Sequence, residues 1–342
     1  MSLPSRPRVT LSDVAAHAGV SIPTVSKVLN NRPDIGEPTR HRVEDAIAKT
    51  GYRRRASAKR VTRAGLVDVV VNGVNSPWVL EVLAGAEEAA YRAGVGLVVT
   101  STHGDSLRHQ WVHSLVRRRS DGVVLVVADI PAETIDRLTA TNVPVVLVDR
   151  TGNSDPRLPS IGAANWSGAL SATEHLLSQG HRRIGMISGH PRLACSAERI
   201  DGYHAALRRA GIPVDPALVL HGDFFPEGGK IGAAQLLSLP EPPTAIFAGS
   251  DLQALGVYEE AHRRRLRIPD DLSVVGFDDL SIAQYVTPSL TTVRQPHSEM
   301  AAEAVRMVLA MKSADRPGPP TRIELATNLV VRQSTAPLEV PA

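Results

Sequence analysis

Short apolar runs that alternate with helical stretches are the feature that most constrains the fold of this chain. Seven runs rich in Val and Ile, each four to six residues long, predict buried strands at 66–71, 95–100, 122–127, 143–148, 184–188, 245–248 and 273–276. Segments with helical periodicity lie between them, at 80–93, 169–179, 200–210, 229–237 and 251–265. Such a rhythm forms parallel sheets that helices cover on both faces. The sequence therefore predicts an α/β fold from residue 66 onward.

The charge of the chain is divided unevenly between its two ends. Residues 1–63 contain thirteen Lys or Arg and five Asp or Glu, a net charge of +8, whereas the remaining residues contain 25 basic and 30 acidic side chains. A basic segment ahead of an acidic body indicates a polyanionic partner, because attraction to successive phosphates accumulates. A solubilising basic tail is the alternative. At 342 residues the chain is also long enough for two or three domains.

The basic segment has the pattern of folded helices rather than of a tail. Thr10 and Asp13 fit a capping box, and apolar residues at helical spacing follow as far as Gly19, a typical C-terminal glycine. A second short helix begins after Ser21, and a third begins at Thr39. Two short helices joined by a tight turn, with a third in support, predict a helix-turn-helix unit.

The second of these helices carries side chains that suit the major groove of DNA. Lys27 can donate to guanine O6 or N7, and Ile22 can contact a thymine methyl group. A helical hairpin that only packs on another surface is the alternative. The DNA-contacting residues that we expect in this unit are Thr10, Ser21, Ile22, Pro23, Thr24, Ser26, Lys27 and Asn30.

Residues 9–30, VTLSDVAAHAGVSIPTVSKVLN, resemble the headpiece of lactose-repressor-type transcription regulators. The resemblance implies a homodimer whose two heads bind near-palindromic operator DNA. It also implies that Ile22, Pro23 and Lys27 supply much of the base readout. Because Pro23 has no polar side chain, we expect readout at that position to be weaker or by contact alone.

The segment that follows the helices, residues 52–63, is rich in Lys and Arg. A flexible charged linker is one interpretation of it. In the resembling family it is a hinge that inserts a leucine into the minor groove, and such wedges unstack a base step. This chain has no leucine between Tyr52 and Leu66, so Val61 is the only bulky apolar candidate. We expect Arg54 and Arg55 to contact phosphates here.

The body also resembles this family, so that the resemblance covers residues 9–335. The matching segments are NSPW at 75–78, GHRRI at 180–184, RIDGY at 199–203, GSDLQA at 249–254, VVGFDD at 274–279 and LTTVRQP at 290–296. The resemblance implies a body with two subdomains similar to periplasmic sugar-binding proteins, with parallel sheets and three chain crossings near 162–165, 290–294 and 325–329. The predicted domains are a headpiece at 1–52, a linker at 53–65 and a body at 66–342, divided into 66–163 with 293–326 and 164–291 with 327–342.

A ligand cleft is expected outside the carboxyl ends of the strands, where open α/β sheets bind ligands. Sugars offer hydroxyl groups to carboxylates and guanidinium groups and C–H faces to aromatic rings, of which the chain has only twelve. The family's ligand positions fall on Ser76, Trp78, Asp149, Cys195, Arg199, Phe224, Ser250 and Asp278, and we add Trp166. The alternatives are core packing for Trp78 and Phe224, a mutual ion pair for Asp149 and Arg199, and an apolar filler for Cys195. Asp251 is interpreted as the cap of the helix after it.

An enzyme is the main rival class, but no catalytic motif is present. The sequence lacks Gly-x-Ser-x-Gly, a phosphate loop, His-Glu-x-x-His and a Gly-x-Gly-x-x-Gly turn. Its single cysteine excludes a disulfide framework and a thiolate zinc cluster. We therefore predict no catalytic residue, no cofactor and no metal.

The sequence predicts a sequence-specific DNA-binding transcriptional regulator, a repressor whose operator affinity is controlled by a small ligand, expected to be a sugar. A sugar-binding receptor or carbohydrate-processing enzyme without a role on DNA is the alternative. No apolar run reaches the roughly 18–20 residues that span a bilayer, and no secretory signal is seen, so we expect a cytoplasmic protein with no membrane partner.

Overall fold

A computed structural model of the chain describes residues 10–29, 32, 35–50, 52, 65–102, 110–126, 132–149, 156–314 and 319–338. Its contacts divide the chain into two units, Met1–Arg63 and Ala64–Ala342. The predicted limits of the headpiece and linker, 1–52 and 53–65, stay a prediction because residues 53–64 lie outside the described residues.

Among its described residues, the first unit contains three helices, α1 (Leu11–Ala18), α2 (Ile22–Leu29) and α3 (Glu37–Thr50). The predicted capping box is confirmed, since the Thr10 amide donates to Asp13 Oδ2 at 2.7 Å and the Asp13 amide donates to Thr10 Oγ1 at 3.4 Å. Gly19 ends α1 with φ of 64°, a left-handed conformation that favours glycine. α3 begins at Glu37, two residues before the predicted start. Apolar side chains from all three helices form one small core: Val14, Ala15, Ala18, Val25, Val28, Val43 and Ala46.

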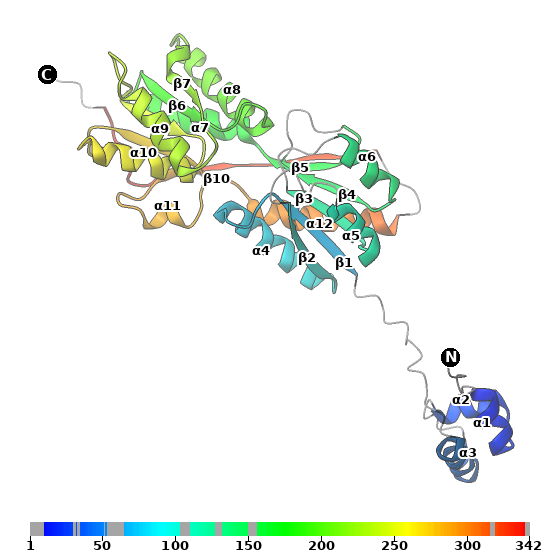
Figure 1. Ribbon diagram of the computed structural model, residues 1–342. Coiled ribbons are helices and arrows are strands. Elements are labelled where there is room, and N and C mark those ends of the chain that lie inside the picture. The colour runs from blue at the N-terminus through cyan, green and yellow to red at the C-terminus, as the bar shows by residue number, and fades with distance from the viewer. Residues whose placement is uncertain are drawn as a thin grey trace, which may run out of the picture. The chain divides into compact units, whose positions relative to one another are not determined.

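The second unit contains two six-stranded sheets, which define two lobes (Figure 1). The first lobe has the strand order β11-β5-β4-β3-β1-β2, and all of its strands are parallel. Its strands are β1 (Leu66–Val71), β2 (Gly96–Ser101), β3 (Gly122–Val126), β4 (Val145–Val148), β5 (Ser160–Ala163) and β11 (Arg322–Leu325). Its helices are α4 (Pro77–Arg92), α5 (Gln110–Arg118), α6 (Ala132–Ala140) and α12 (His297–Ser313).

The second lobe has the strand order β12-β10-β9-β8-β6-β7, in which only β12 is antiparallel to its neighbour. Its strands are β6 (Ile184–Ser188), β7 (Val219–His221), β8 (Ala245–Ala248), β9 (Ser273–Asp278), β10 (Thr291–Arg294) and β12 (Asn328–Val330). Its helices are α7 (Asn165–Ser178), α8 (Ala194–Arg209), the short 3-10 helix η2 (Pro216–Leu218), α9 (Pro226–Leu236), α10 (Asp251–Arg263) and α11 (Ile282–Tyr285). The predicted α/β class with parallel sheets is therefore confirmed.

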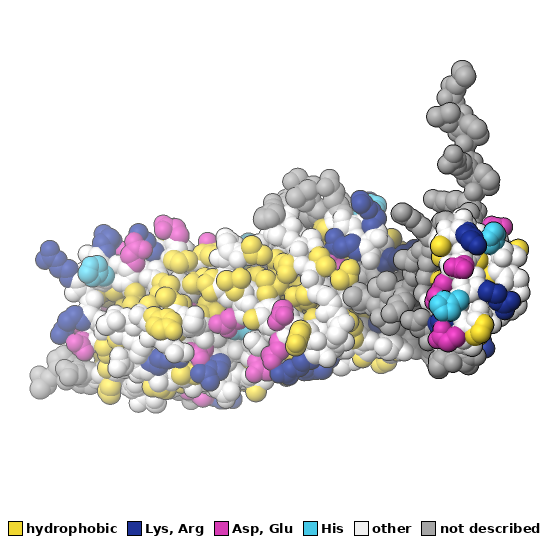
Figure 2. Space-filling view, turned by 90° about the horizontal axis from the view of Figure 1, so that it is seen from below, with side chains coloured by type: hydrophobic (Ala, Val, Ile, Leu, Met, Phe, Trp, Pro, Cys, Tyr) yellow, Lys and Arg dark blue, Asp and Glu magenta, His cyan; other side chains and the backbone are white. Residues whose placement is uncertain are grey.

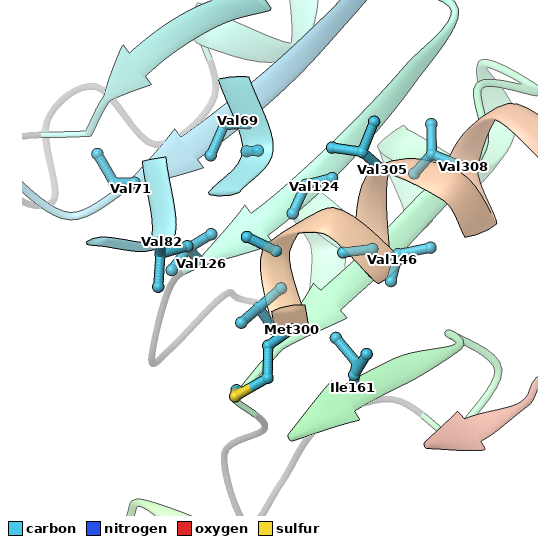
Figure 3. Close-up of a cluster of buried hydrophobic side chains, with 14 of the residues drawn as sticks. Val69, Val71, Val82, Val124, Val126, Val146, Ile161, Met300, Val305 and Val308 are labelled. Carbon is cyan, nitrogen blue, oxygen red and sulfur yellow. The ribbon is translucent and has the colours of Figure 1, made fainter. Parts of the chain in front are cut away.

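The core of the first lobe shows why Val-rich runs form these strands. Valine side chains of β1, β3 and β4 point toward α4 and α12 (Figure 3), where Val124, Val146 and Val305 are completely buried. Full burial of one such side chain contributes about 1.5–3 kcal/mol. The two helices approach closely at Gly85, where a Cβ atom would lie 2.3 Å from the Ser298 carbonyl oxygen. The sheet is thereby held rigid beneath the strand ends that carry the site.

The chain crosses between the lobes three times. It crosses from β5 to α7, from β10 to α12 and from β11 to β12. The first and third crossings are hydrogen-bonded to each other, since the Ala164 amide donates to the Leu325 carbonyl at 2.8 Å and Thr327 Oγ1 donates to the Ala164 carbonyl at 3.1 Å. The prediction that 293–294 belong to the first subdomain is wrong, because Val293 pairs with Phe277 in the second sheet.

Candidate ligand cleft and DNA-binding surface

A cleft opens between the two lobes, at the carboxyl ends of the strands in both sheets. It encloses a cavity of about 270 Å³, close to the lower end of the range of about 300–1,000 Å³ for small-molecule sites. The residues that line it from the first lobe are Asn72, Gly73, Asn75, Ser76, Trp78, Val79, Val126, Val148 and Asp149. Those from the second lobe are Leu193, Cys195, Arg199, Asp223, Phe224, Phe225, Ser250, Leu252 and Asp278, and Gln295 follows β10.

Eight of the nine predicted ligand residues line this cavity, and Trp166 does not. Trp166 is 39% exposed on α7, with the Arg209 guanidinium carbon 5.9 Å from its ring centroid. The preceding residue, Asn165, is the buried one at the start of this helix. Successive helical residues are rotated by about 100°, so Trp166 is directed away from the side that Asn165 buries.

Arg199 is the central cation of the cleft. Its side chain is 3% exposed and stacks between two rings, with its guanidinium carbon 3.7 Å from the Phe277 centroid and 5.3 Å from the Phe224 centroid. Arg199 Nε donates to Asn165 Oδ1 at 2.9 Å, and Nη1 donates to the Gly249 carbonyl. Cation–π contact and these hydrogen bonds fix the plane of the guanidinium, so its remaining N–H donors are preorganised for a ligand.

Two carboxylates face this cation from different lobes. Burial raises the pKa of Asp278 to about 6, although Arg199 and then His297 act in the opposite direction. Burial also raises the pKa of Asp149, again against the attraction of Arg199. The backbone φ is positive at both residues, 121° at Asp278 and 53° at Asp149, and residues other than glycine rarely adopt such values. Raised carboxyl pKa values and strained backbone are typical of functional sites. The alternative of a direct Asp149–Arg199 ion pair is not seen among the described residues.

Phe224 forms the aromatic wall of the second lobe. Its φ is 67°, and its ring lies against Gly189, where a Cβ atom would be 2.1 Å from the ring. The Phe224 carbonyl accepts a hydrogen bond from Ser250 Oγ at 2.9 Å, and Ser250 Oγ in turn accepts from the Gln253 amide at 3.0 Å. Ser250 is therefore the N-cap of α10 as well as a wall of the cleft.

Asp251 is not the helix cap that the sequence predicted. It is completely buried, where it accepts from the Leu280 amide at 2.7 Å and from the Thr292 hydroxyl. Asp251 thus ties β10 to the loop that follows β9, and Asp278 is the last residue of β9. The cap is Ser250 instead, because that residue holds the extended conformation just before the helix begins.

Trp78 and Cys195 each line the cleft and also fit the structural role that was their alternative, core packing for Trp78 and an apolar filler for Cys195. Trp78 packs on the core of the first lobe and also lines the cleft, with its ring edge-on to His297 at 6.0 Å. Burial raises the pKa of the Cys195 thiol to about 12, so it stays protonated and acts as an apolar wall.

Gln295 is a cleft residue that the sequence analysis missed. It is 4% exposed, its Nε2 donates to Asp278 Oδ1 at 2.5 Å, and its buried Oε1 has no protein partner among the described residues. It lies directly after β10, as the penultimate residue of the LTTVRQP segment at 290–296, and this segment was the available signal. A ligand that donates a hydrogen bond would satisfy this oxygen.

The helix-turn-helix unit presents α2 to solvent on one face. Ser21, Ile22, Pro23 and Lys27 are exposed, while Thr24 and Ser26 are half-buried. Exposed Thr10 keeps its capping-box contacts, and the Ser21 and Thr24 hydroxyl oxygens lie 2.9 Å apart. The predicted contacts at Asn30, Arg54, Arg55 and Val61 lie outside the described residues.

Two other kinds of feature, a membrane-spanning helix and a metal site, are not found in the described residues. In the ranges given above, no helix has the length and apolarity that crossing a membrane requires. Over the same ranges, no three His, Cys, Asp or Glu side chains gather closely enough to hold a metal ion.

A helix-turn-helix unit and a two-lobed α/β body with a polar, aromatic-lined cleft define the class of ligand-responsive DNA-binding regulators. Residues 10–55 match the family of bacterial regulatory proteins, lacI family, and residues 173–335 match the periplasmic binding protein-like domain. The repressor CytR of Escherichia coli K12 is 34% identical over 333 residues, covering 96% of this chain and 97% of CytR. The repressor PurR of Photobacterium profundum is 31% identical, covering 96% and 99%.

Solved structures agree with these relatives. A complex of the transcriptional regulator CelR with cellobiose has a TM-score of 0.73 and 31% identity, and the match covers 96% of this chain and all of that one. The lac repressor dimer bound to operator and the anti-inducer ONPF has a TM-score of 0.72 and 27% identity, with the same coverage. This chain belongs to the lacI family of bacterial regulatory proteins. It is a DNA-binding transcriptional regulator and not an enzyme.

Proposed function

We propose that this protein is a cytoplasmic repressor that binds a near-palindromic operator as a homodimer and releases it when a small sugar fills the cleft. The observation that carries the proposal is the cavity of about 270 Å³, in which Arg199, three carboxylates and three aromatic side chains converge from both lobes.

The chemistry of the cleft favours a neutral polyhydroxyl ligand. Asp149, Asp278 and Gln295 Oε1 are hydrogen-bond acceptors, and Arg199 supplies donors, so vicinal hydroxyl groups can be bound as donors and acceptors together. Three carboxylates against one guanidinium in the lining disfavour an anionic ligand. The structural relatives bound to cellobiose and to ribose, at 31% and 25% identity, support a sugar.

Operator binding is proposed to use the exposed face of α2. Lys27 and Ile22 are exposed there, whereas Val25 and Val28 of the same helix are buried. The charge of +8 on residues 1–63 adds attraction to phosphates, so binding should weaken steeply as salt rises.

A homodimer is supported by an unpaired sheet edge and exposed apolar side chains. β2 is the edge strand of the first sheet, and an open edge is a template for association. Leu80, Tyr91 and Val99 on α4 and β2 are 55%, 79% and 44% exposed. Figure 2 shows hydrophobic side chains gathered along one face of the body.

The proposed control is linkage between cleft closure and operator affinity. A sugar contacts residues of both lobes, so it favours one angle between them. It can change operator affinity only as far as the two angles differ in their fit to DNA, and the coupling is reciprocal. We expect an inducer, which weakens operator binding, whereas a co-repressor would strengthen it.

A thermal-shift screen of mono- and disaccharides tests the ligand, because a molecule bound only by the folded state stabilises by mass action. A sugar present at 100 times its Kd should add about 2.7 kcal/mol. Its effect on operator affinity is then titrated by fluorescence anisotropy, with Arg199→Ala as the control. A sugar that raises Tm of the wild type and the variant equally would reject the cleft as its site, and turnover of the sugar would reject the regulator assignment.

A further inference from the structure

We propose that Asn165 is a positioning residue that fixes the Arg199 guanidinium in the cleft, and that the Glu198–Arg322 ion pair ties this fixation to the angle between the lobes. The part that concerns operator affinity rests on the proposed function. The part that concerns Arg199 stands on the geometry of the body alone.

Asn165 holds its neighbours through both the oxygen and the nitrogen of its side-chain amide. Oδ1 accepts from Arg199 Nε at 2.9 Å, while Nδ2 donates to the Ala163 carbonyl at 3.1 Å and to Glu198 Oε2 at 3.1 Å. The side chain is 3% exposed and begins α7 directly after the first crossing. Because both hydrogens and the oxygen are used, the amide has one orientation only, and a buried amide network of this kind is rigid.

The Glu198–Arg322 pair joins the two lobes beside the crossings. Glu198 lies on α8 of the second lobe, and Arg322 lies on β11, the edge strand of the first sheet. Arg322 Nη2 is 3.4 Å from Glu198 Oε1 and 3.7 Å from the neighbouring Glu324 carboxylate. A rotation of one lobe against the other changes the first of these distances, because its two ends belong to different sheets.

The contacts therefore run in one chain from the lobe boundary into the cleft. Arg322 holds Glu198, Glu198 holds the Asn165 amide, and the amide holds Arg199. Asn165, Glu198 and Arg322 line a second cavity of about 20 Å³, which shares Asp149 and Cys195 with the ligand cleft. A ligand that fastens Arg199 thereby favours the lobe angle at which the ion pair is closed, and by reciprocity the closed pair favours the ligand-binding pose of Arg199.

The first experiment measures Arg199 directly, in the full chain without ligand or DNA. The water-exchange rate of the Arg199 Nε–H group is followed by nuclear magnetic resonance, with its signal assigned through its loss in Arg199→Lys. In the wild type it should exchange at least tenfold more slowly than that of Arg209, whose side chain is 59% exposed. Asn165→Leu should remove this protection, and Asn165→Asp, which keeps an acceptor oxygen, should retain it.

The decisive variant in this experiment is Arg322→Gln, because Arg322 does not contact Arg199. Exchange at Arg199 Nε–H should rise severalfold in this variant if the ion pair governs the pose of the guanidinium. A purely local structural role of Arg322 would leave the rate unchanged. Rapid exchange in the wild type, or full protection in Asn165→Leu, would overturn the positioning role of Asn165.

The second experiment is a double-mutant cycle on operator affinity, using a duplex selected from a near-palindromic library. Glu198→Gln keeps the acceptor for Asn165 and removes the charge. This variant and Arg322→Gln should each change the operator Kd by about twofold to fivefold in the same direction, as suits a partly exposed pair. The double variant should change it no further, because the interaction is already lost.

The matched control is Glu174–Arg209, an ion pair of 3.0 Å between α7 and α8 of the second lobe. The same Gln substitutions there should leave the operator Kd unchanged. Unchanged affinity in both variants of the Glu198–Arg322 cycle, or a double variant equal to the product of the singles, overturns the link to the lobe angle. If the wild type binds no operator at all, the proposed function fails, while the exchange experiment still decides the role of Asn165.

Discussion

Replacing Asp278 by Asn should stabilise the body at neutral pH, although it removes a charge from the proposed ligand site. The folded protein raises the pKa of this carboxyl from 3.8 to about 6, mainly through burial. Each pKa unit corresponds to about 1.4 kcal/mol, so keeping Asp278 ionised in the folded state costs about 3 kcal/mol. The Asn side chain keeps an oxygen that can accept the hydrogen bond from Gln295 Nε2.

The sign of the pH dependence follows from the raised pKa. As pH falls from 7 through 6 toward 4, the folded state takes up a proton at Asp278 before the unfolded state does, and the free energy of unfolding rises. The advantage of Asp278→Asn should therefore be largest above pH 7 and fall to about half at pH 5. In a body of this size, about 3 kcal/mol corresponds to a Tm increase of roughly 6–12 °C.

The assay is urea unfolding of wild type and variant at pH 7.5, 6 and 5, analysed as the difference between the two proteins so that other titrating groups cancel. Asp279→Asn is the matched control. The Asp279 carboxylate is 3% exposed and accepts hydrogen bonds from Arg294 and Arg332, so removing its charge should destabilise the body. A variant Asp278→Asn that is less stable than wild type at pH 7.5, or whose advantage does not depend on pH, would refute the reasoning.

Four further substitutions separate the roles assigned above. Lys27→Ala should cost about 1–3 kcal/mol of operator binding by anisotropy, with Tm unchanged; undiminished affinity would remove Lys27 from the interface. Arg199→Ala should abolish the sugar-induced Tm shift and leave the ligand-free operator Kd within about twofold, and a normal shift would discard the cleft assignment. Gly189→Ala places a Cβ atom 2.1 Å from the Phe224 ring, so overpacking should cost about 1–3 kcal/mol and weaken sugar binding at least tenfold by calorimetry. Trp166→Ala should leave sugar affinity unchanged, and a loss would restore Trp166 to the site.

The sequence was informative where one physical signal dominated a segment. The Val- and Ile-rich runs of β1, β6, β8 and β9 are buried on both faces, and each was predicted within one or two residues. Short or polar strands gave no such signal. β11 has the burial pattern of an exposed edge, and β12 has three residues only. The predicted strand at 143–148 begins later, at Val145, because Pro144 has no amide hydrogen for the sheet.

The cleft could be predicted only where a residue type and a family position coincided. Arg199 and Asp278 are charged residues in recognisable segments, and both line the cavity, while their contact with a ligand stays a prediction. Trp166 was expected in the cleft because it follows the first crossing, yet a rotation of one residue along α7 decides which side chain is buried there. Asn165 and Gln295 act through hydrogen bonds to other side chains, and such contacts between distant segments have no local sequence pattern.

The cap of α10 has a consequence for which metabolites can enter the cleft. The Ser250 hydroxyl has one hydrogen, which goes to the Phe224 carbonyl, and one of its lone pairs takes the Gln253 amide. An incoming molecule meets only the other lone pair, and must itself give a hydrogen in order to bond there. The charged oxygens of phosphate and carboxylate groups have no hydrogen to give at neutral pH, so at this point of the cleft the hydroxyl that starts the helix favours a donating group such as a sugar hydroxyl.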